Sequence, residues 1–196
     1  MKGALLMKVL LVNGSPHAHG ATAAALELVA KALQENGIET QLFFLGTGTL
    51  ADCTGCGQCR QAGKCVIDDG VNQLGALAAE CDGFVFGSPV HYASASGAIT
   101  SFLDRAFYAG GKLMRMKPAA CIASARRAGT TAALDQLNKY LMINEMPVVS
   151  SCYWPMVHGS DAGQVLLDEE GCQTMRNLGR NLAWLLRCIE AGKAAG

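Results

Sequence analysis

The sequence has no excess of charge of either sign. Its 16 basic and 16 acidic residues give a formal net charge of zero, and charged residues make up only 16% of the chain. It also lacks a basic stripe with interleaved aromatic residues, which argues against nucleic-acid binding. No apolar stretch reaches the ~18 residues that a membrane-spanning helix needs. Lys8 interrupts the apolar start and no small-residue cleavage site follows it, so this start predicts a buried strand rather than a signal peptide. We therefore expect a cytoplasmic protein that binds neither nucleic acid nor membrane.

The composition is that of a folded domain held together by a hydrophobic core. Hydrophobic residues make up 51% of the 196 residues, which excludes disorder and is enough for a core without disulfides. Nine cysteines without a secretion signal also argue against a disulfide scaffold. We find no repeat, linker or domain boundary, and we expect a single domain over residues 1–196.

Apolar runs alternate along the chain with segments of helical pattern. Such alternation requires crossover connections, and it therefore predicts an α/β fold: a five-stranded parallel sheet with helices on both faces. The predicted strands are residues 7–12, 38–45, 82–87, 119–123 and 147–151. The predicted helices are residues 22–35, 71–80, 97–107, 130–142 and 168–189.

In such a sheet, ligands bind beyond the carboxyl ends of the strands, and the loop after the first strand has the features of an anion site. Residues 13–22 contain two glycines, Ser15, His17, His19 and Thr22, and they lead directly into a helix. Glycines let backbone N–H groups turn toward an anion, and the helix N-terminus adds partial positive charge. The alternative is a plain turn with Thr22 as the N-cap. The Gly-Lys-Ser/Thr ending of a Walker loop is missing, and the Gly-x-Gly sequence at residues 46–51 follows the wrong strand for a dinucleotide fingerprint.

The loops after the third and fourth strands are rich in small residues with accessible backbone amides. Residues 87–97 include Tyr92, whose ring is suited to lie against a planar ligand. Residues 124–130 contain two arginines, a glycine and hydroxyl groups. Taken singly, each loop also fits an ordinary surface loop.

Taken together, these segments resemble the NAD(P)H-dependent FMN reductases and iron–sulfur flavoproteins of the flavodoxin-like superfamily, over residues 7–140. That family's first loop reads Gly-Ser-Pro and then Gly-Asn-Thr, and here Ala21 replaces the asparagine. The later Gly-Ser-Pro-Val-Tyr pattern has His91 at the place of the tyrosine, with Tyr92 beside it. Residues 102–105 match the family's Phe-Ile-Asp-Arg pattern, with Thr100 in place of the usual preceding lysine. Residues 126–130 resemble its third flavin loop.

The resemblance implies a flavodoxin-like three-layer sandwich that binds FMN. It places the FMN phosphate at the first loop and the isoalloxazine ring between the other two, and it names no catalytic acid or base. The implied phosphate site comprises Ser15, His17, Gly20, Ala21 and Thr22. The implied ring site comprises Pro89, Val90, His91 and Tyr92 on one side and Ser124, Arg127 and Gly129 on the other.

Four of the nine cysteines lie within thirteen residues, with the spacing C-x₂-C-x₂-C-x₅-C. Cys53, Cys56, Cys59 and Cys65 resemble the [4Fe–4S] ligands of bacterial ferredoxins apart from the longer last gap, and the iron–sulfur flavoproteins carry their cysteines in the same region. Structural zinc and a metal-free cysteine loop are the alternatives.

The resemblance implies an oxidoreductase in which bound FMN carries the redox chemistry. Electrons would come from NAD(P)H by hydride transfer, or singly from a ferredoxin-like partner through the cluster, and they would leave to a quinone, a flavin or another small acceptor. A flavin-binding electron carrier or redox-sensing module without a substrate is the alternative. A phosphoryl-binding signalling domain is disfavoured, since no acidic cluster follows the first strand. Relatives of this fold are commonly homodimers or homotetramers, and the Tyr153–Met156 segment is a candidate contact.

Overall fold

A computed structural model describes residues 7–195 of the chain. Residues 1–6 and residue 196 of the expected domain lie outside the described residues. The main sheet is parallel and has the strand order β2-β1-β3-β5-β6, so the chain crosses from one side of β1 to the other after β2. The strands of this sheet are β1 (Lys8–Asn13), β2 (Glu39–Phe44), β3 (Gly83–His91), β5 (Ala119–Ala125) and β6 (Met156–His158).

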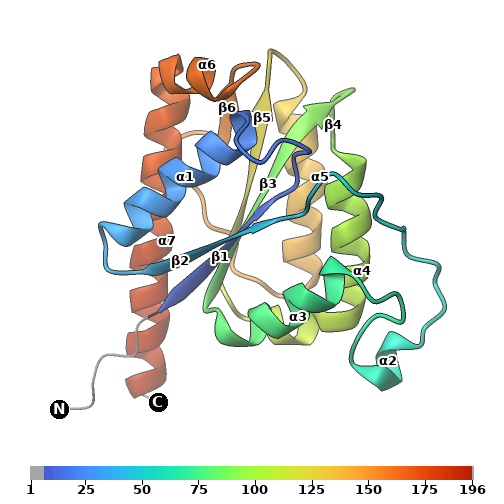
Figure 1. The fold of residues 1–196 in the computed structure, drawn as a ribbon. Helices are drawn as coiled ribbons and strands as arrows, with labels where there is room; N and C mark the ends of the chain where they lie inside the picture. The colour runs from blue at the N-terminus through green and yellow to red at the C-terminus, as the bar shows by residue number, and fades with distance from the viewer. Residues whose placement is uncertain (1–6, 196) are drawn as a thin grey trace.

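Helices cover both faces of this sheet, which confirms the predicted α/β architecture (Figure 1). One face packs against α1 (Ala21–Gln34), α6 (Ala162–Leu167) and α7 (Glu169–Ala195). The other packs against α3 (Gly70–Glu80), α4 (Gly97–Met114) and α5 (Thr130–Ile143). The central strands are buried on both sides, which is why they read in the sequence as nearly continuous apolar runs.

The predicted fifth strand at residues 147–151 is wrong, because the outer edge of β5 is shared by two separate segments. At the start of β5, Ala119 N–H donates to Pro147 O at 2.9 Å and Val149 N–H donates to Ala119 O at 2.8 Å, which forms only an isolated bridge. Residues 150–154 then leave the sheet, Pro155 O accepts from Ala123 N–H at 3.0 Å, and β6 pairs with the last residues of β5. An apolar segment does touch β5 where the sequence predicts it, but it is too short to form a strand.

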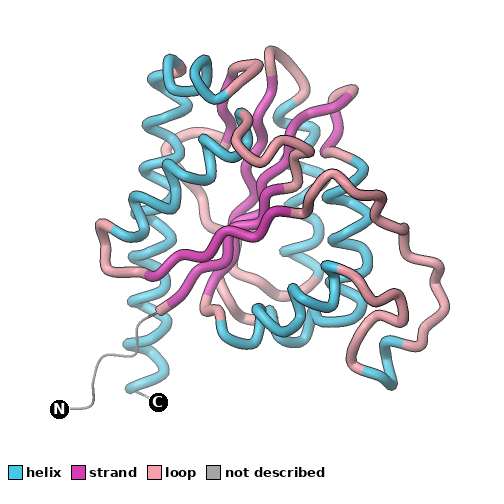
Figure 2. The backbone as a smooth tube through the Cα atoms, in the orientation of Figure 1, coloured by secondary structure: helices cyan, strands magenta, loops and turns pink. Residues whose placement is uncertain are grey.

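The structure also extends or adds several elements. Strand β3 continues through the predicted loop to His91 and turns back into β4 (Ser94–Ala95), which pairs with it in antiparallel orientation. Tyr92 and Ala93 form this turn with φ of 50° and 60°. A long loop joins β2 to α3 and holds only the four-residue helix α2 (Cys59–Ala62) (Figure 2). This loop carries the four clustered cysteines.

Candidate functional site

A cavity of about 770 Å³ opens at the carboxyl ends of β1, β3 and β5. Nine of the twelve residues that the sequence assigns to FMN line it. Tyr92, Arg127 and Gly129 do not: Tyr92 is fully exposed at the β3–β4 turn, and Arg127 is exposed beyond β5. The nine are Ser15, His17, Gly20, Ala21, Thr22, Pro89, Val90, His91 and Ser124.

The N-terminus of α1 forms one wall of this cavity and leaves backbone donors free. Its N-cap is Gly20 rather than Thr22, and no side chain caps the helix. Within the described residues, no group accepts a hydrogen bond from the N–H groups of Ala21, Thr22 and Ala23. The first turn holds no acidic residue. Free N–H groups and the positive end of the helix dipole suit this wall, the anion wall, to binding an anion.

Side-chain hydrogen bonds hold the loop before α1 in a fixed shape. Asn13 Oδ1 accepts from Ser15 N–H at 3.0 Å, and Ser15 Oγ accepts from His17 N–H at 3.1 Å. The Thr22 and Ser124 hydroxyls, both buried, lie 2.8 Å apart and join this loop to the end of β5. The anion wall and the end of β5 are therefore coupled before any ligand binds.

Gly129 allows the loop at residues 126–130 to approach the β3–β4 turn closely. It is the N-cap of α5 with φ of 93°, and a Cβ placed on it would lie 2.6 Å from Ala93 Cα. Gly129 therefore does not line the cavity, but it lets its loop pack closely against the turn that follows the lining residues of β3.

Replacing Gly129 with alanine will lower the free energy of unfolding by about 1–3 kcal/mol, because the left-handed backbone and the Ala93 contact both oppose a side chain. Urea unfolding measures this loss. Gly97→Ala is the matched control, since nothing lies within 4 Å of its added Cβ at the start of α4. Equal stability of both variants and the wild type would contradict the prediction.

The loop after β6 also lines the cavity, and the sequence does not predict this contribution. Gly159, Ser160 and Asp161 lie there, and Asp161 caps α6 by accepting from Gln164 N–H at 2.9 Å. They follow the strand that the sequence misplaces. A sequence prediction that placed β6 correctly would point to these three residues, because every loop at the carboxyl edge of the sheet follows a strand. Four further lining residues belong to the predicted loops but not to the assigned set: Pro16, Ala18, Ala125 and Arg126. His19, noted as a donor, also lines the cavity.

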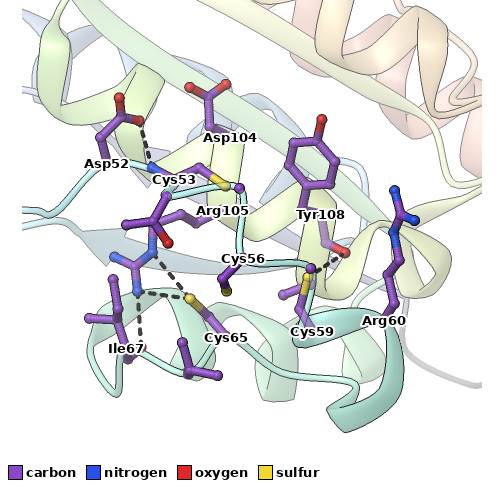
Figure 3. A pocket seen from close by; sticks show the side chains of 15 residues that line it. Asp52, Cys53, Cys56, Cys59, Arg60, Cys65, Ile67, Asp104, Arg105 and Tyr108 are labelled. Carbon is purple, nitrogen blue, oxygen red and sulfur yellow. Dashed lines mark hydrogen bonds between the residues drawn. The ribbon is translucent and has the colours of Figure 1, made fainter.

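A second cavity, of about 450 Å³, contains all four clustered cysteines (Figure 3). Cys53 and Cys56 come from the extended part of the loop, Cys59 begins α2, and Cys65 follows α2. Asp104, Arg105 and Tyr108 of α4 form the opposite wall. Gly55, Gly57 and Gly63 have φ of 66°, 71° and 67°, a backbone region that favours glycine, and so let the loop turn sharply between the thiols.

The thiols have different surroundings within this cavity. Hydrogen bonds from Gln58 N–H and the Thr54 side chain lower the pKa of the exposed Cys56 thiol. Cys59 Sγ donates to Tyr108 O at 3.6 Å, and Cys65 Sγ accepts from Arg105. All nine cysteines, each of which lies in the described part of the chain, are free thiols. No three His, Cys, Asp or Glu side chains among residues 7–195 converge on the position of a single metal ion.

Charged side chains of α4 line the cysteine cavity, and Asp69, the N-cap of α3, pairs with one of them. A hydrogen bond from Arg105 to Asp69 raises the pKa of Arg105 against the opposing effect of burial. Burial alone would raise the pKa of Asp69, but hydrogen bonds from Arg105 and Val71 N–H outweigh it and hold the pKa below its ordinary value. Burial and a hydrogen bond to Asp104 raise the pKa of the Tyr140 phenol, which stays protonated at neutral pH.

The parallel sheet in this strand order, with an anion wall at its carboxyl edge, defines a flavodoxin-like protein. The chain superposes on an archaeal flavodoxin with a TM-score of 0.64 at 15% identity, covering 92% of this chain and 99% of the flavodoxin. It superposes on a flavone reductase with a TM-score of 0.74 at 16% identity, covering 94% of this chain and 64% of the reductase. The predicted flavodoxin-like fold is confirmed.

Residues 7–161 match the family model described as NADPH-dependent FMN reductase, and the chain belongs to this family. It is 31% identical over 193 residues to an iron–sulfur flavoprotein of Methanocaldococcus jannaschii. This match covers 94% of this chain and 100% of that protein. It is 23% identical over 192 residues to an iron–sulfur flavoprotein of Methanosarcina thermophila, covering 95% and 99%. The resemblance stated from the motifs is confirmed. Among residues 7–195, no helix has both the length and the apolar character that crossing a bilayer requires.

Proposed function

We propose that this chain is an FMN-dependent oxidoreductase formed by one domain over residues 1–196, with a [4Fe–4S] cluster at Cys53, Cys56, Cys59 and Cys65. It passes electrons from NAD(P)H or a ferredoxin-like donor through FMN to a quinone, a flavin or another small acceptor. When bound, FMN supplies two-electron and one-electron chemistry, and the cluster supplies one-electron transfer. The observation that carries the proposal is the presence of two cavities in one chain, one with an anion wall and one with four thiols.

The residues of the first cavity fit FMN. The three free N–H groups at the start of α1 would donate to an anion such as the FMN phosphate, and His17 and His19 line the same cavity. Pro89, Val90 and His91 provide the extended wall of β3, against which the isoalloxazine ring is proposed to lie. The exposed Tyr92 ring lies next to this wall along the chain, where it is free to cover a bound ring or contact a partner.

The residues of the second cavity supply the four thiolates that a cubic cluster needs. The four thiols are among the residues that line a cavity of about 450 Å³. A cubic cluster is bound by four cysteines that are spread around it, while zinc needs all four sulfurs at about 2.3 Å from one centre. The free thiols also suit the reducing cytoplasm, where we propose the protein resides.

We further propose that the protein assembles as a homodimer or homotetramer. Tyr153 and Trp154 are about half exposed, and their rings form an edge-to-face pair at 4.8 Å in the loop between the bridge at Val148 and β6. Such an aromatic pair is typical of buried contacts between subunits.

Two measurements on anaerobically purified protein test this function. Flavin, iron, zinc and acid-labile sulfide are assayed on one sample, and turnover is tested with NADH and with NADPH. Bound FMN with about four irons per chain and NAD(P)H oxidation would support the whole proposal. FMN without iron would remove the cluster from it, and zinc would assign the cysteines to a structural site. Reversible reduction without turnover would favour the electron carrier. Absence of both flavin and iron, with no binding of added FMN, would overturn it.

A further inference from the structure

Arg105 is the charged side chain most completely enclosed by the described part of the chain. It lies on α4, and its side chain is 1% exposed. A guanidinium carries five N–H donors and stays charged, so burying it demands acceptors on every side. Its partners therefore show what the residue holds in place.

All of these partners lie on the cysteine loop and its flanks. Nε and Nη2 each donate to Cys65 Sγ at 3.3 Å. Nη1 donates to Ala51 O at 3.3 Å, just before the first cysteine, and Nη2 donates to Ile67 O at 2.9 Å, just after the last. The two ends of the loop are thus held by one side chain, as Figure 3 shows for Cys65 and Ile67.

Asp69 completes this arrangement by fixing the guanidinium. Its two oxygens accept from Nη1 at 2.6 Å and from Nη2 at 2.9 Å, and it also caps α3 through Val71 N–H. The bidentate pair sets the plane of the guanidinium, which leaves Nε and one edge directed at the sulfur. Lysine cannot reproduce this arrangement, because its ammonium is a single point of charge.

We infer that Arg105 is a positioning residue for the cysteine-bound cluster: it closes the loop at residues 51 and 67 and directs two N–H donors at the Cys65 sulfur. The inference rests on the proposed cluster. Hydrogen bonds to cluster sulfurs and nearby positive charge favour the more negative, reduced state, and so raise the reduction potential. Arg105 therefore sets the potential of the cluster as well as the shape of its site.

The reduction potential of the cluster in the whole protein tests this role. Arg105→Gln should lower the equilibrium constant for one-electron reduction by about tenfold, which is about 59 mV, and Arg105→Lys should fall between Gln and wild type. Asp69→Asn should shift the potential upward instead, since Arg105 then lacks its counter-charge. Arg60→Gln is the matched control. It removes a positive charge from the same cavity, but the described structure shows no bond from Arg60 to a sulfur, so a shift well under that of Arg105→Gln is expected.

Opposite shifts for Arg105→Gln and Asp69→Asn are a result that a purely structural role does not produce. If Arg105→Gln and Arg105→Lys keep the wild-type potential, or if Arg60→Gln matches Arg105→Gln, the inference is overturned.

A second measurement on the protein without iron separates this inference from the proposed cluster. In the wild type, iodoacetamide should modify Cys65 at least about tenfold more slowly than the exposed Cys56, because Cys65 is half-buried and two N–H donors of Arg105 hold its sulfur against α4. In Arg105→Gln, or in Arg105→Lys if the first variant loses its helical circular dichroism, the two rates should converge. An unchanged ratio in the variants would contradict the clamp. A wild type that binds no iron on anaerobic purification but shows the ratio would contradict only the proposed cluster.

Discussion

Replacing Ala21 with aspartate will weaken FMN binding by about 100-fold without destabilising the protein. Ala21 is the first residue of α1, and its N–H is one of the free donors at the anion wall. A carboxylate there meets a phosphate that carries about −1.5 to −2 charges. Repulsion at an effective dielectric constant near ~20 amounts to a few kcal/mol, and every ~1.4 kcal/mol is tenfold in affinity. Titration of the flavin-free protein with FMN, followed by fluorescence, measures the change.

The stability of the flavin-free variant makes this prediction specific. An acidic residue in the first turn of a helix interacts favourably with the helix dipole, so Ala21→Asp should keep or slightly raise the unfolding midpoint. Ala21→Asn is the matched control, because it has the same shape without the charge and should bind FMN as the wild type does. Unchanged affinity in the aspartate variant would show that the phosphate lies elsewhere.

Replacing Cys56 with alanine will remove the proposed cluster while the FMN site persists. Iron and acid-labile sulfide should fall from about four each per chain to less than about one, because a cubic cluster needs all four thiolates. Cys56 is exposed in the loop and contributes nothing to the core, so the fold should be unaffected. Iron assay and electron paramagnetic resonance of the reduced protein measure the loss.

Two controls show whether a loss of iron in Cys56→Ala is specific to this cysteine. Cys188→Ala, on the exposed surface of α7 and outside the cysteine cavity, should retain the full iron content. The bound flavin should remain near one per chain in both variants, since the two cavities share no lining residue. Full iron content in Cys56→Ala would exclude this cysteine as a ligand.

The sequence predicts the sheet well because burial on both faces leaves an unambiguous signal. The apolar runs at residues 9–12, 84–86 and 119–123 are the buried parts of β1, β3 and β5. The error at residues 147–151 has a physical cause. Pro147 and Val149 do bond to β5, but pairing along the chain cannot be read from the composition of an apolar segment. The sequence therefore predicts this edge strand in the wrong place and does not point to Gly159, Ser160 and Asp161, which follow β6.

Parts of the candidate sites that are formed by residues close together in the sequence can be predicted from it, whereas contacts between distant residues cannot. The cysteine spacing and the loop before α1 are local, so the structure brings their residues together as the sequence suggests. The contacts of Arg105 join residues 36 to 54 positions apart, and nothing in the Phe-Leu-Asp-Arg segment shows which loop the arginine would hold. Tyr92 departs from the cavity because its place in a two-residue turn depends on the antiparallel pairing of β4 with β3.

The divided outer edge of β5 also bears on how the protein avoids aggregation. An exposed edge strand offers unpaired backbone groups that can recruit a strand from another molecule. Here this side of the sheet ends in a three-residue strand and an isolated bridge, with residues 150–154 leaving the sheet between them. Neither piece is long enough to template a partner. A shortened chain in which residues 147–149 ran straight into β6 would gain a continuous edge and lose this protection.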